Sequence, residues 1–299
     1  MKADRVYIRT SGWSYKSWGK SFYPVGVSPG RQLQFYATQF PTVEVNGTFY
    51  RLPTQKTFAT WNQDAPPGFL YSIKGSRAVT HFKRLRPGAK SLKILSTRSR
   101  SLQDHLGPIL WQLPGTLKKD LVRLRSFLQR LNRRVGHAIE FRDPSWLDEE
   151  VFKLLRRHGV ANVALSSTAM PKCLEITARF VYVRFHGLDG GAAHDYTDRE
   201  LRPWAKFLRH AARTGVEAFV YFNNDVNTRA PSNALRLIEL VGPFAMRFSA
   251  KAKVISRPAW GTRTIALRRH EITLHSIIGC IQIEEGRRRR NSESCSPAV

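Results

Sequence analysis

The chain has 299 residues, of which 42% are hydrophobic and 11% aromatic, and its formal net charge is +27 at pH 7. This composition supports a sizeable core and excludes a disordered chain, and no apolar run approaches the roughly 20 residues of a membrane span. The N-terminus lacks the apolar core of a signal peptide. The three cysteines are scattered, which argues against a disulfide framework or a zinc knuckle and suits a reducing compartment, so we expect a cytoplasmic protein.

Strand-like and helix-like segments alternate along most of the chain. Seven helices are predicted at residues 31–40, 53–61, 92–106, 116–131 (with Thr116 as the cap), 148–158, 198–213 and 230–241. Eight strands are predicted at residues 6–15, 42–50, 69–76, 107–114, 136–142, 160–167, 180–187 and 216–224. Only residues 168–179 lack a convincing helix between two strands.

This alternation predicts an α/β fold with a parallel sheet, and eight repeats over roughly 250 residues predict a single-domain (β/α)8 TIM-type barrel. An open, doubly wound sheet is the alternative, but no Gly-rich dinucleotide loop or P-loop is present. We place the barrel domain at residues 1–245. Residues 246–299 form a basic C-terminal extension in which the alternation is lost, and we expect that extension to be largely disordered.

The positive charge is concentrated in the segment 83–134. It contains 14 Lys and Arg against Asp104 and Asp120, a net charge of 14 − 2 = +12. Such a segment suits a polyanionic partner: nucleic acid, the ribosome or an acidic membrane surface. It also suits a soluble basic surface without a dedicated partner, because Arg outnumbers Lys throughout the chain.

Several motifs occur in a fixed order along the chain: TSGWSY at 10–15, TFYRLP at 48–53, THFKRL at 80–85, EFR with PSW at 140–146, and YFNND at 221–225. Together they resemble the YecE-like family, a domain of unknown function (domain of unknown function 72). The resemblance covers about residues 6–241 and implies a TIM-type barrel, without implying a reaction. Arg9 stands where the family usually has Gly, and Ser166 where it often has Asp.

In a TIM barrel the functional groups lie at the C-terminal ends of the strands. Here nearly every predicted strand end carries a polar side chain, which predicts a ligand site at the mouth. The residues expected to bind the ligand are Glu44, Asn46, Gln112, Arg142, Arg184, Tyr221 and Asn223, and those expected to act in catalysis are Lys74, Glu140 and His186.

The residue types suggest a role for each group. Glu140 suits a general acid or base, His186 a proton shuttle, and Lys74 the stabilisation of developing negative charge. Arg142 and Arg184 suit the capture of a phosphate or carboxylate, although both could instead pair with Glu140 and Glu44 inside the barrel. No metal or other cofactor is assigned, because the mouth offers fewer carboxylate and His ligands than barrel metal sites use.

The leading hypothesis is a barrel protein that binds an anionic, phosphate-containing ligand and performs acid–base chemistry on it. The rival is a non-catalytic nucleic-acid-binding protein that uses the segment 83–134, with loop aromatics such as Trp13, Tyr50 and Trp146 stacking on bases or packing the rim. We expect no membrane partner. The sequence decides neither between enzyme and binding protein nor the oligomeric state.

Overall fold

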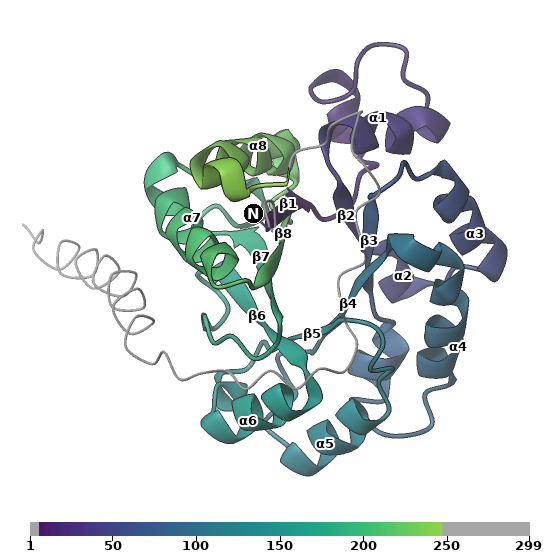
Figure 1. Cartoon of the computed structure of the whole chain (residues 1–299), viewed down its shortest axis with the longest axis vertical. Coiled ribbons are helices and arrows are strands. Elements are labelled where there is room, and N and C mark those ends of the chain that lie inside the picture. The colour runs from purple at the N-terminus through teal and green to yellow at the C-terminus, as the bar shows by residue number, and fades with distance from the viewer. Residues whose placement is uncertain (1–5, 247–299) are drawn as a thin grey trace, which may run out of the picture.

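The computed structural model describes residues 6–246, and it places eight parallel strands in one sheet that curls into a nearly closed barrel (Figure 1). The strand order is β1-β8-β7-β6-β5-β4-β3-β2, so neighbours in sequence are neighbours in space. This confirms the predicted (β/α)8 architecture. The strands are β1 Val6–Thr10, β2 Thr42–Val45, β3 Leu70–Lys74, β4 Leu106–Gln112, β5 His137–Glu140, β6 Val160–Ser167, β7 Phe180–Gly187 and β8 Glu217–Phe222.

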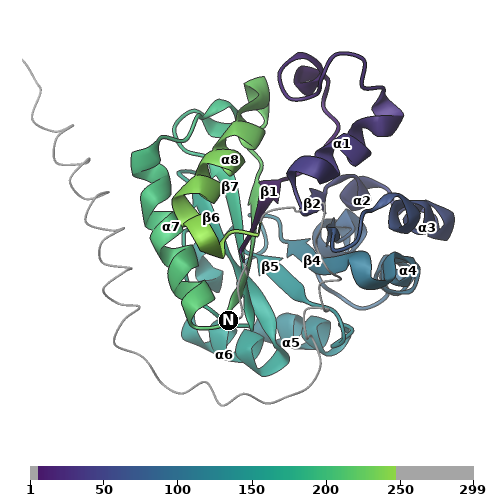
Figure 2. The same cartoon turned by 45° about the horizontal axis from the view of Figure 1, so that its top comes forward.

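Helices cover the outside of the barrel, and α7 and α8 lie side by side near β8 and β1 (Figure 2). The helices are α1 Gln32–Gln39, α2 Gly47–Tyr50, α3 Gln55–Asp64, α4 Lys90–Arg98, α5 Leu121–Gln129, α6 Glu149–His158, α7 Asp198–Arg213 and α8 Arg229–Val241. Capping matches the sequence at α7, where Thr197 and Glu200 form a reciprocal capping box. Among the helices of residues 6–246, none combines the length and the apolar character needed to cross a membrane.

Apolar side chains fill two layers, as the alternation along β7 predicts. Tyr182 points into the barrel interior, where it joins Phe219 and Tyr221 in one buried cluster. Val183 and Phe185 point the other way, into the layer between the strands and the helices. The interior is therefore packed, and only the strand ends are left for polar chemistry.

The barrel closes through a short seam between β1 and β2. One parallel bridge joins Ser11 to Glu44, and the amide of Gly12 donates to the carbonyl oxygen of Glu44 at 2.8 Å. Lower down, β1 pairs with the chain that follows α8, because the amide of Met246 donates to the Val6 carbonyl at 2.8 Å. The seam thus brings the end of β1 against the end of β2 at the mouth.

Three local predictions were wrong. The first strand ends at Thr10 instead of continuing to residue 15. The second strand ends at Val45, and the following residues turn into the short helix α2 instead of continuing as a strand to residue 50. Thr116 does not cap the next helix. Asp120 does, because its side chain accepts from the amide of Arg123 and a carboxylate is the better partner at a helix start. Residues 168–179 contain no helix, as predicted. The extension predicted at 246–299 lies, apart from Met246, outside the described residues.

Candidate functional site

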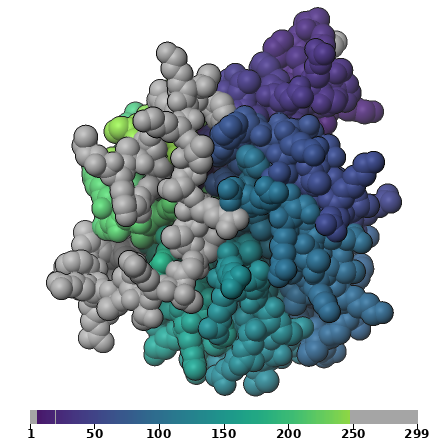
Figure 3. Space-filling view, turned by 45° about the vertical axis from the view of Figure 1, so that its right-hand side comes forward, coloured from purple at the N-terminus to yellow at the C-terminus, as the bar shows by residue number. Residues whose placement is uncertain are grey.

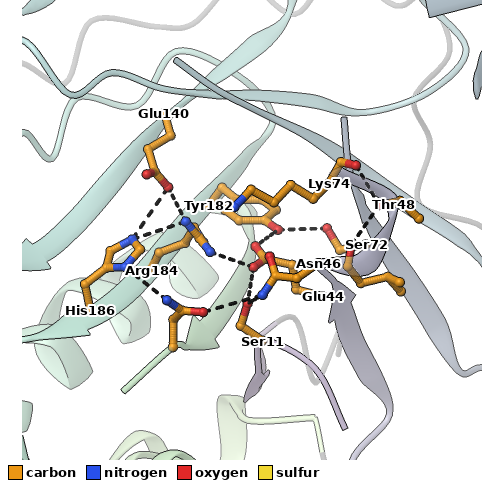
Figure 4. A network of polar contacts seen from close by, with 12 residues as sticks. Ser11, Glu44, Asn46, Thr48, Ser72, Lys74, Glu140, Tyr182, Arg184 and His186 are labelled. Carbon is orange, nitrogen blue, oxygen red and sulfur yellow. Dashed lines mark hydrogen bonds and ion pairs between the residues drawn. The ribbon is translucent and has the colours of Figure 1, made fainter. Parts of the chain in front are cut away.

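The mouth is organised around a buried arginine that bridges two buried carboxylates (Figure 4). Arg184, near the end of β7, reaches across the barrel. Its Nη1 lies 2.6 Å from Oε2 of Glu140 on β5, and its Nη2 lies 2.9 Å from Oε1 of Glu44 on β2. All three side chains are buried. Burial alone would lower the pKa of Arg184, but the two carboxylates raise it above its ordinary value, so the guanidinium stays charged.

Hydrogen bonds hold Glu44 in place from several strands. The Tyr182 hydroxyl donates to Oε2 of Glu44 at 2.6 Å, and the Ser11 hydroxyl donates to Oε1. Ser72, on β3, lies 2.8 Å from the Tyr182 hydroxyl, and Asn46 donates to the Ser11 hydroxyl oxygen at 2.6 Å. Because these hydrogen bonds form one connected chain around Glu44, its carboxylate is held in a single position before any ligand binds.

On the other side, Glu140 is shared by three nitrogen-containing side chains. Nε of Arg142 donates to Oε1 of Glu140 at 2.8 Å, and Nε2 of His186 lies 3.7 Å from Oε2. Burial alone would raise the pKa of Glu140, but Arg184, His186 and Arg142 hold it well below its usual value. Glu140 is therefore ionised at neutral pH.

His186 is neutral at the same pH, because burial first, and the charge of Arg184 second, lower its pKa. Its Nδ1 lies 3.3 Å from Nδ2 of Asn223, and its Nε2 lies 3.2 Å from Nη1 of Arg184. An ionised carboxylate beside a neutral imidazole is a pair that can accept and relay a proton.

Lys74 differs from the other cations of the mouth. It ends β3, and its Nζ lies 4.6 Å from the centroid of the Phe49 ring. Among the described residues, no carboxylate forms an ion pair with it. Burial is the main reason that its pKa falls to about 8, and the charge of Arg184 adds to the decrease, while Glu44 and Glu140 oppose it.

The structure brings most of the predicted residues together, but not all. Glu44, Asn46, Glu140, Arg184 and His186 form one connected network, which also contains Asn223. Tyr221 lies deeper, in the barrel interior, where its hydroxyl is 3.1 Å from Oγ1 of Thr42. Gln112 pairs with Glu140 along the strand ladder and is buried.

Three further side chains belong to the site and were not predicted as parts of it. Ser11 and Tyr182 bind Glu44, and His81 packs edge-on against Phe49 with ring centroids 5.0 Å apart. Tyr182 could have been found from the sequence, because it shares a face of its strand with Arg184 and His186.

The two departures from the YecE-like pattern have separate structural settings. Ser166 is buried and its hydroxyl lies 2.9 Å from that of Tyr196, which also bonds the amide of Gly187. Arg9 is buried near the seam, where its guanidinium lies 5.3 Å from the Phe40 ring and donates to the carbonyl oxygen of Met246 at 2.8 Å. Neither residue contacts the carboxylates of the mouth directly.

A metal site is not evident among the described residues. No group of three or more His, Cys, Asp or Glu side chains between residues 6 and 246 has the geometry to hold a metal ion. Glu44, Glu140 and His186 are close together, but Arg184 lies between the two carboxylates and bonds both.

The cationic side chains of the basic segment 83–134 lie apart from this network, on α4, α5 and the turns around them. The segment forms part of the surface coloured blue to teal in Figure 3. Ten of its 14 cationic side chains are exposed. Two others, Lys119 and Arg123, are partly buried and form ion pairs with Asp148 and Asp120.

Comparisons with known proteins agree with the fold and the resemblance. The UPF0759 protein YunF of Bacillus subtilis (strain 168) is 25% identical over 269 residues, which cover 79% of this chain and 94% of YunF. The crystal structure of a DUF72 family protein of Thermotoga maritima, TM1631, is 27% identical, with a TM-score of 0.71 over 79% of this chain and 98% of that one.

A DUF72 family protein of Enterococcus faecalis, EF0366, has a TM-score of 0.68 over 79% of this chain and 95% of that chain. At 17% identity this likeness shows the fold alone. The family model described as "Protein of unknown function DUF72" matches residues 7–255, most of the chain and beyond the boundary predicted at residue 245. The chain therefore belongs to the DUF72 family.

Proposed function

We propose that the chain binds a small anionic, phosphate-containing ligand at the C-terminal mouth of its barrel and catalyses acid–base chemistry on it. The observation that carries this proposal is the state of Lys74. It is a partly buried amine at the mouth with no carboxylate partner among residues 6–246, whereas Arg184 pairs with two carboxylates and Arg142 with one. An unpaired cation in such a place is stabilised by an anion that binds beside it.

The other arginines divide into two roles. Arg184 bonds both Glu44 and Glu140, so we assign it to positioning the carboxylates instead of holding the ligand. Arg142 contacts Glu140 through Nε alone among the described residues, and its side chain is 29% exposed. Its two terminal nitrogens thus remain for a phosphate, which they would bind in a bidentate manner.

Glu140 and His186 supply the proton chemistry. Glu140 is ionised and His186 is neutral near pH 7, so either can take a proton from a bound ligand. Asn223 contacts the far nitrogen of His186 and orients its ring. Nδ2 of Asn46 lies 3.5 Å from Oδ1 of Asn223, so Asn46 adds a further polar group to the lining of the site.

Native mass spectrometry of the full chain, purified without chelator, tests this proposal. We expect a copurified phosphorylated metabolite, lost in Arg142→Met and retained in Arg125→Met, which removes an exposed arginine of the basic segment. A ligand-free barrel that also fails to bind added ribose 5-phosphate would contradict the proposal. So would binding that is equal in both variants.

A second function is favoured by a separate observation at the rim. The guanidinium of Arg77 lies 5.4 Å from the ring of Tyr50 and 5.3 Å from that of Phe82, and both rings are exposed. An exposed aromatic pair with an arginine between them suits base stacking, and the basic segment 83–134 suits a phosphate backbone. A non-catalytic nucleic-acid-binding protein is therefore the alternative.

Salt-dependent binding of single-stranded DNA distinguishes this alternative. Replacing Arg125, Arg133 and Arg134 by Gln should weaken binding and reduce the salt slope by roughly 2–3 if each contacts a phosphate. The matched control replaces three exposed cations of α7 on the other side of the barrel, Arg199, Arg202 and Lys206. Equal effects of both triple variants would indicate non-specific attraction and would remove support for this alternative.

A further inference from the structure

A second group of reactive side chains lies beside the paired charges of the mouth, and Lys74 is at its centre. The hydroxyl of Thr48 donates to the carbonyl oxygen of Lys74 at 2.6 Å and fixes the base of its side chain. From there the chain extends over the strand ends toward Arg184 (Figure 4). Its Nζ lies 4.6 Å from the centroid of Phe49, and the His81 ring lies 5.0 Å from the same centroid.

This setting favours the neutral form of the amine. The pKa of Lys74 falls from 10.5 to about 8, mainly through burial. At pH 7 a lysine with a pKa of about 8 has roughly 300 times more neutral amine than an ordinary lysine. Neutral lysine is the nucleophile that adds to carbonyl compounds, and a desolvated site next to another cation is how proteins produce it.

We assign the transfer of the Lys74 proton to His81, whose ring packs against the same Phe49 side chain as the amine. Burial first, and then the charges of Lys74, Arg142 and Arg77, lower its pKa below the ordinary value, so its ring is neutral at pH 7. Its Nδ1 lies 2.9 Å from the hydroxyl of Thr80, which orients the ring. The amine and the imidazole thus both lie within 5.0 Å of the centroid of the Phe49 ring.

Building on the proposed function, we infer that Lys74 forms a Schiff base with a small aldehyde or ketone whose anionic group is bound by Arg142. The geometry supplies an amine over an aromatic wall, a neighbouring imidazole and a guanidinium with free terminal nitrogens. The anionic group is a phosphate or a carboxylate, both of which a guanidinium binds.

The step balances with the groups present. The Lys74 ammonium gives a proton to His81, and the neutral nitrogen forms a bond to the carbonyl carbon. A proton moves from that nitrogen to the oxygen, which yields the neutral carbinolamine. Protonated His81 then donates its proton to the hydroxyl, the C–O bond breaks, and water leaves. The product is the protonated imine, with the positive charge that the ammonium carried at the start.

Reductive trapping tests the inference on the full chain. Sodium cyanoborohydride is added with dihydroxyacetone phosphate in one arm and pyruvate in the other, and peptide mapping locates the adduct. We expect Lys74 to be modified at least about tenfold more than Lys118, an exposed lysine paired with Asp143. The arm that labels faster identifies phosphate or carboxylate as the anionic group.

Three variants separate reactivity from structure. Lys74→Arg keeps the positive charge and should give no adduct at this position, while Lys118→Met should leave the modification of Lys74 unchanged. His81→Gln should slow adduct formation by about 10²-fold while anion binding persists.

Modification of Lys74 no greater than that of Lys118, in a protein that still binds ribose 5-phosphate through Arg142, would overturn the Schiff base and leave the proposed function standing. Absence of both adduct and binding would overturn the two together.

Discussion

Two arginines are buried inside the same barrel, and their surroundings are opposite. Arg184 bonds the carboxylates of Glu44 and Glu140. Arg9 has no carboxylate partner among residues 6–246, and contacts carbonyl oxygens of Ile8 and Met246 and the ring of Phe40. In both, Nε has no hydrogen-bond partner within the described part of the chain. The two arginines therefore differ in whether a carboxylate compensates the charge of the guanidinium.

The pKa values follow this difference. The carboxylates raise the pKa of Arg184, whereas burial lowers the pKa of Arg9 to about 9. A buried charge with two partners belongs to a network that positions other groups, and a buried charge without one is a cost to the fold. Arg184 therefore marks the mouth, where we propose the ligand site, and Arg9 marks a tolerated position at the seam of the barrel.

The largest effect is expected from Arg184→Met. The substitution leaves two buried carboxylates facing each other without a cation, so the free energy of unfolding should fall by about 3–5 kcal/mol. Urea unfolding at pH 7, followed by circular dichroism, measures it. A loss below about 1 kcal/mol would show that water reaches the mouth and that the arginine does not organise it.

Arg9→Met should act in the opposite direction. It replaces an uncompensated buried charge by an apolar side chain of similar length, and the free energy of unfolding should rise by about 1–4 kcal/mol. The same urea titration measures the change, with Arg184→Met as the contrasting variant. A clear destabilisation by Arg9→Met would mean that the contacts of Arg9 with the Ile8 and Met246 carbonyls stabilise the seam. The contrast drawn between Arg9 and Arg184 would then be wrong.

Glu140→Gln should have a smaller effect on stability, about 1.5–3 kcal/mol, because Arg184 keeps Glu44 as a partner. The folded-state pKa of Glu140 lies below the ordinary 4.5, so its stabilisation is present above pH 4.5 and is lost as the pH falls further. The variant should lack this acid-dependent loss. Parallel pH profiles of wild type and variant between pH 7 and pH 3 would contradict the assignment.

The smallest effect is expected from Lys118→Met, which removes a cation paired with Asp143 at 2.6 Å. The Lys118 side chain is 75% exposed, so the pair should contribute at most about 1 kcal/mol. Thermal unfolding at low and high salt measures this. If Lys118→Met lowered stability more than Glu140→Gln, the exposed pair would contribute more than the buried one, and side-chain exposure would not predict the contribution of an ion pair here.

The sequence predicted the barrel well, because period-two and period-3.6 patterns are local and the right-handed β–α rhythm leaves few arrangements. The range predicted for the helix at 198–213 agrees with the structure, and a Thr–Glu capping box starts it. The second strand was predicted too long. The strand ends directly before Asn46 and Gly47, a pair typical of turns, and a single turn of helix follows.

The site could be predicted only in part. Strand-end positions identified Glu44, Glu140 and Arg184, because topology alone brings such residues to one mouth. Which charges pair could not be decided, since Glu44 and Arg184 lie 140 positions apart and the pairing depends on side-chain reach across the barrel. The low pKa of Lys74 arises from burial against Phe49, which no local pattern encodes.

The most direct test of the ligand site is a crystal structure of the full chain soaked with tungstate, an anomalous scatterer that substitutes for phosphate. We expect the strongest anomalous peak at the barrel mouth, within bonding distance of Lys74 Nζ and the terminal nitrogens of Arg142. Peaks confined to the basic segment 83–134, with none at the mouth, would contradict it and favour nucleic-acid binding.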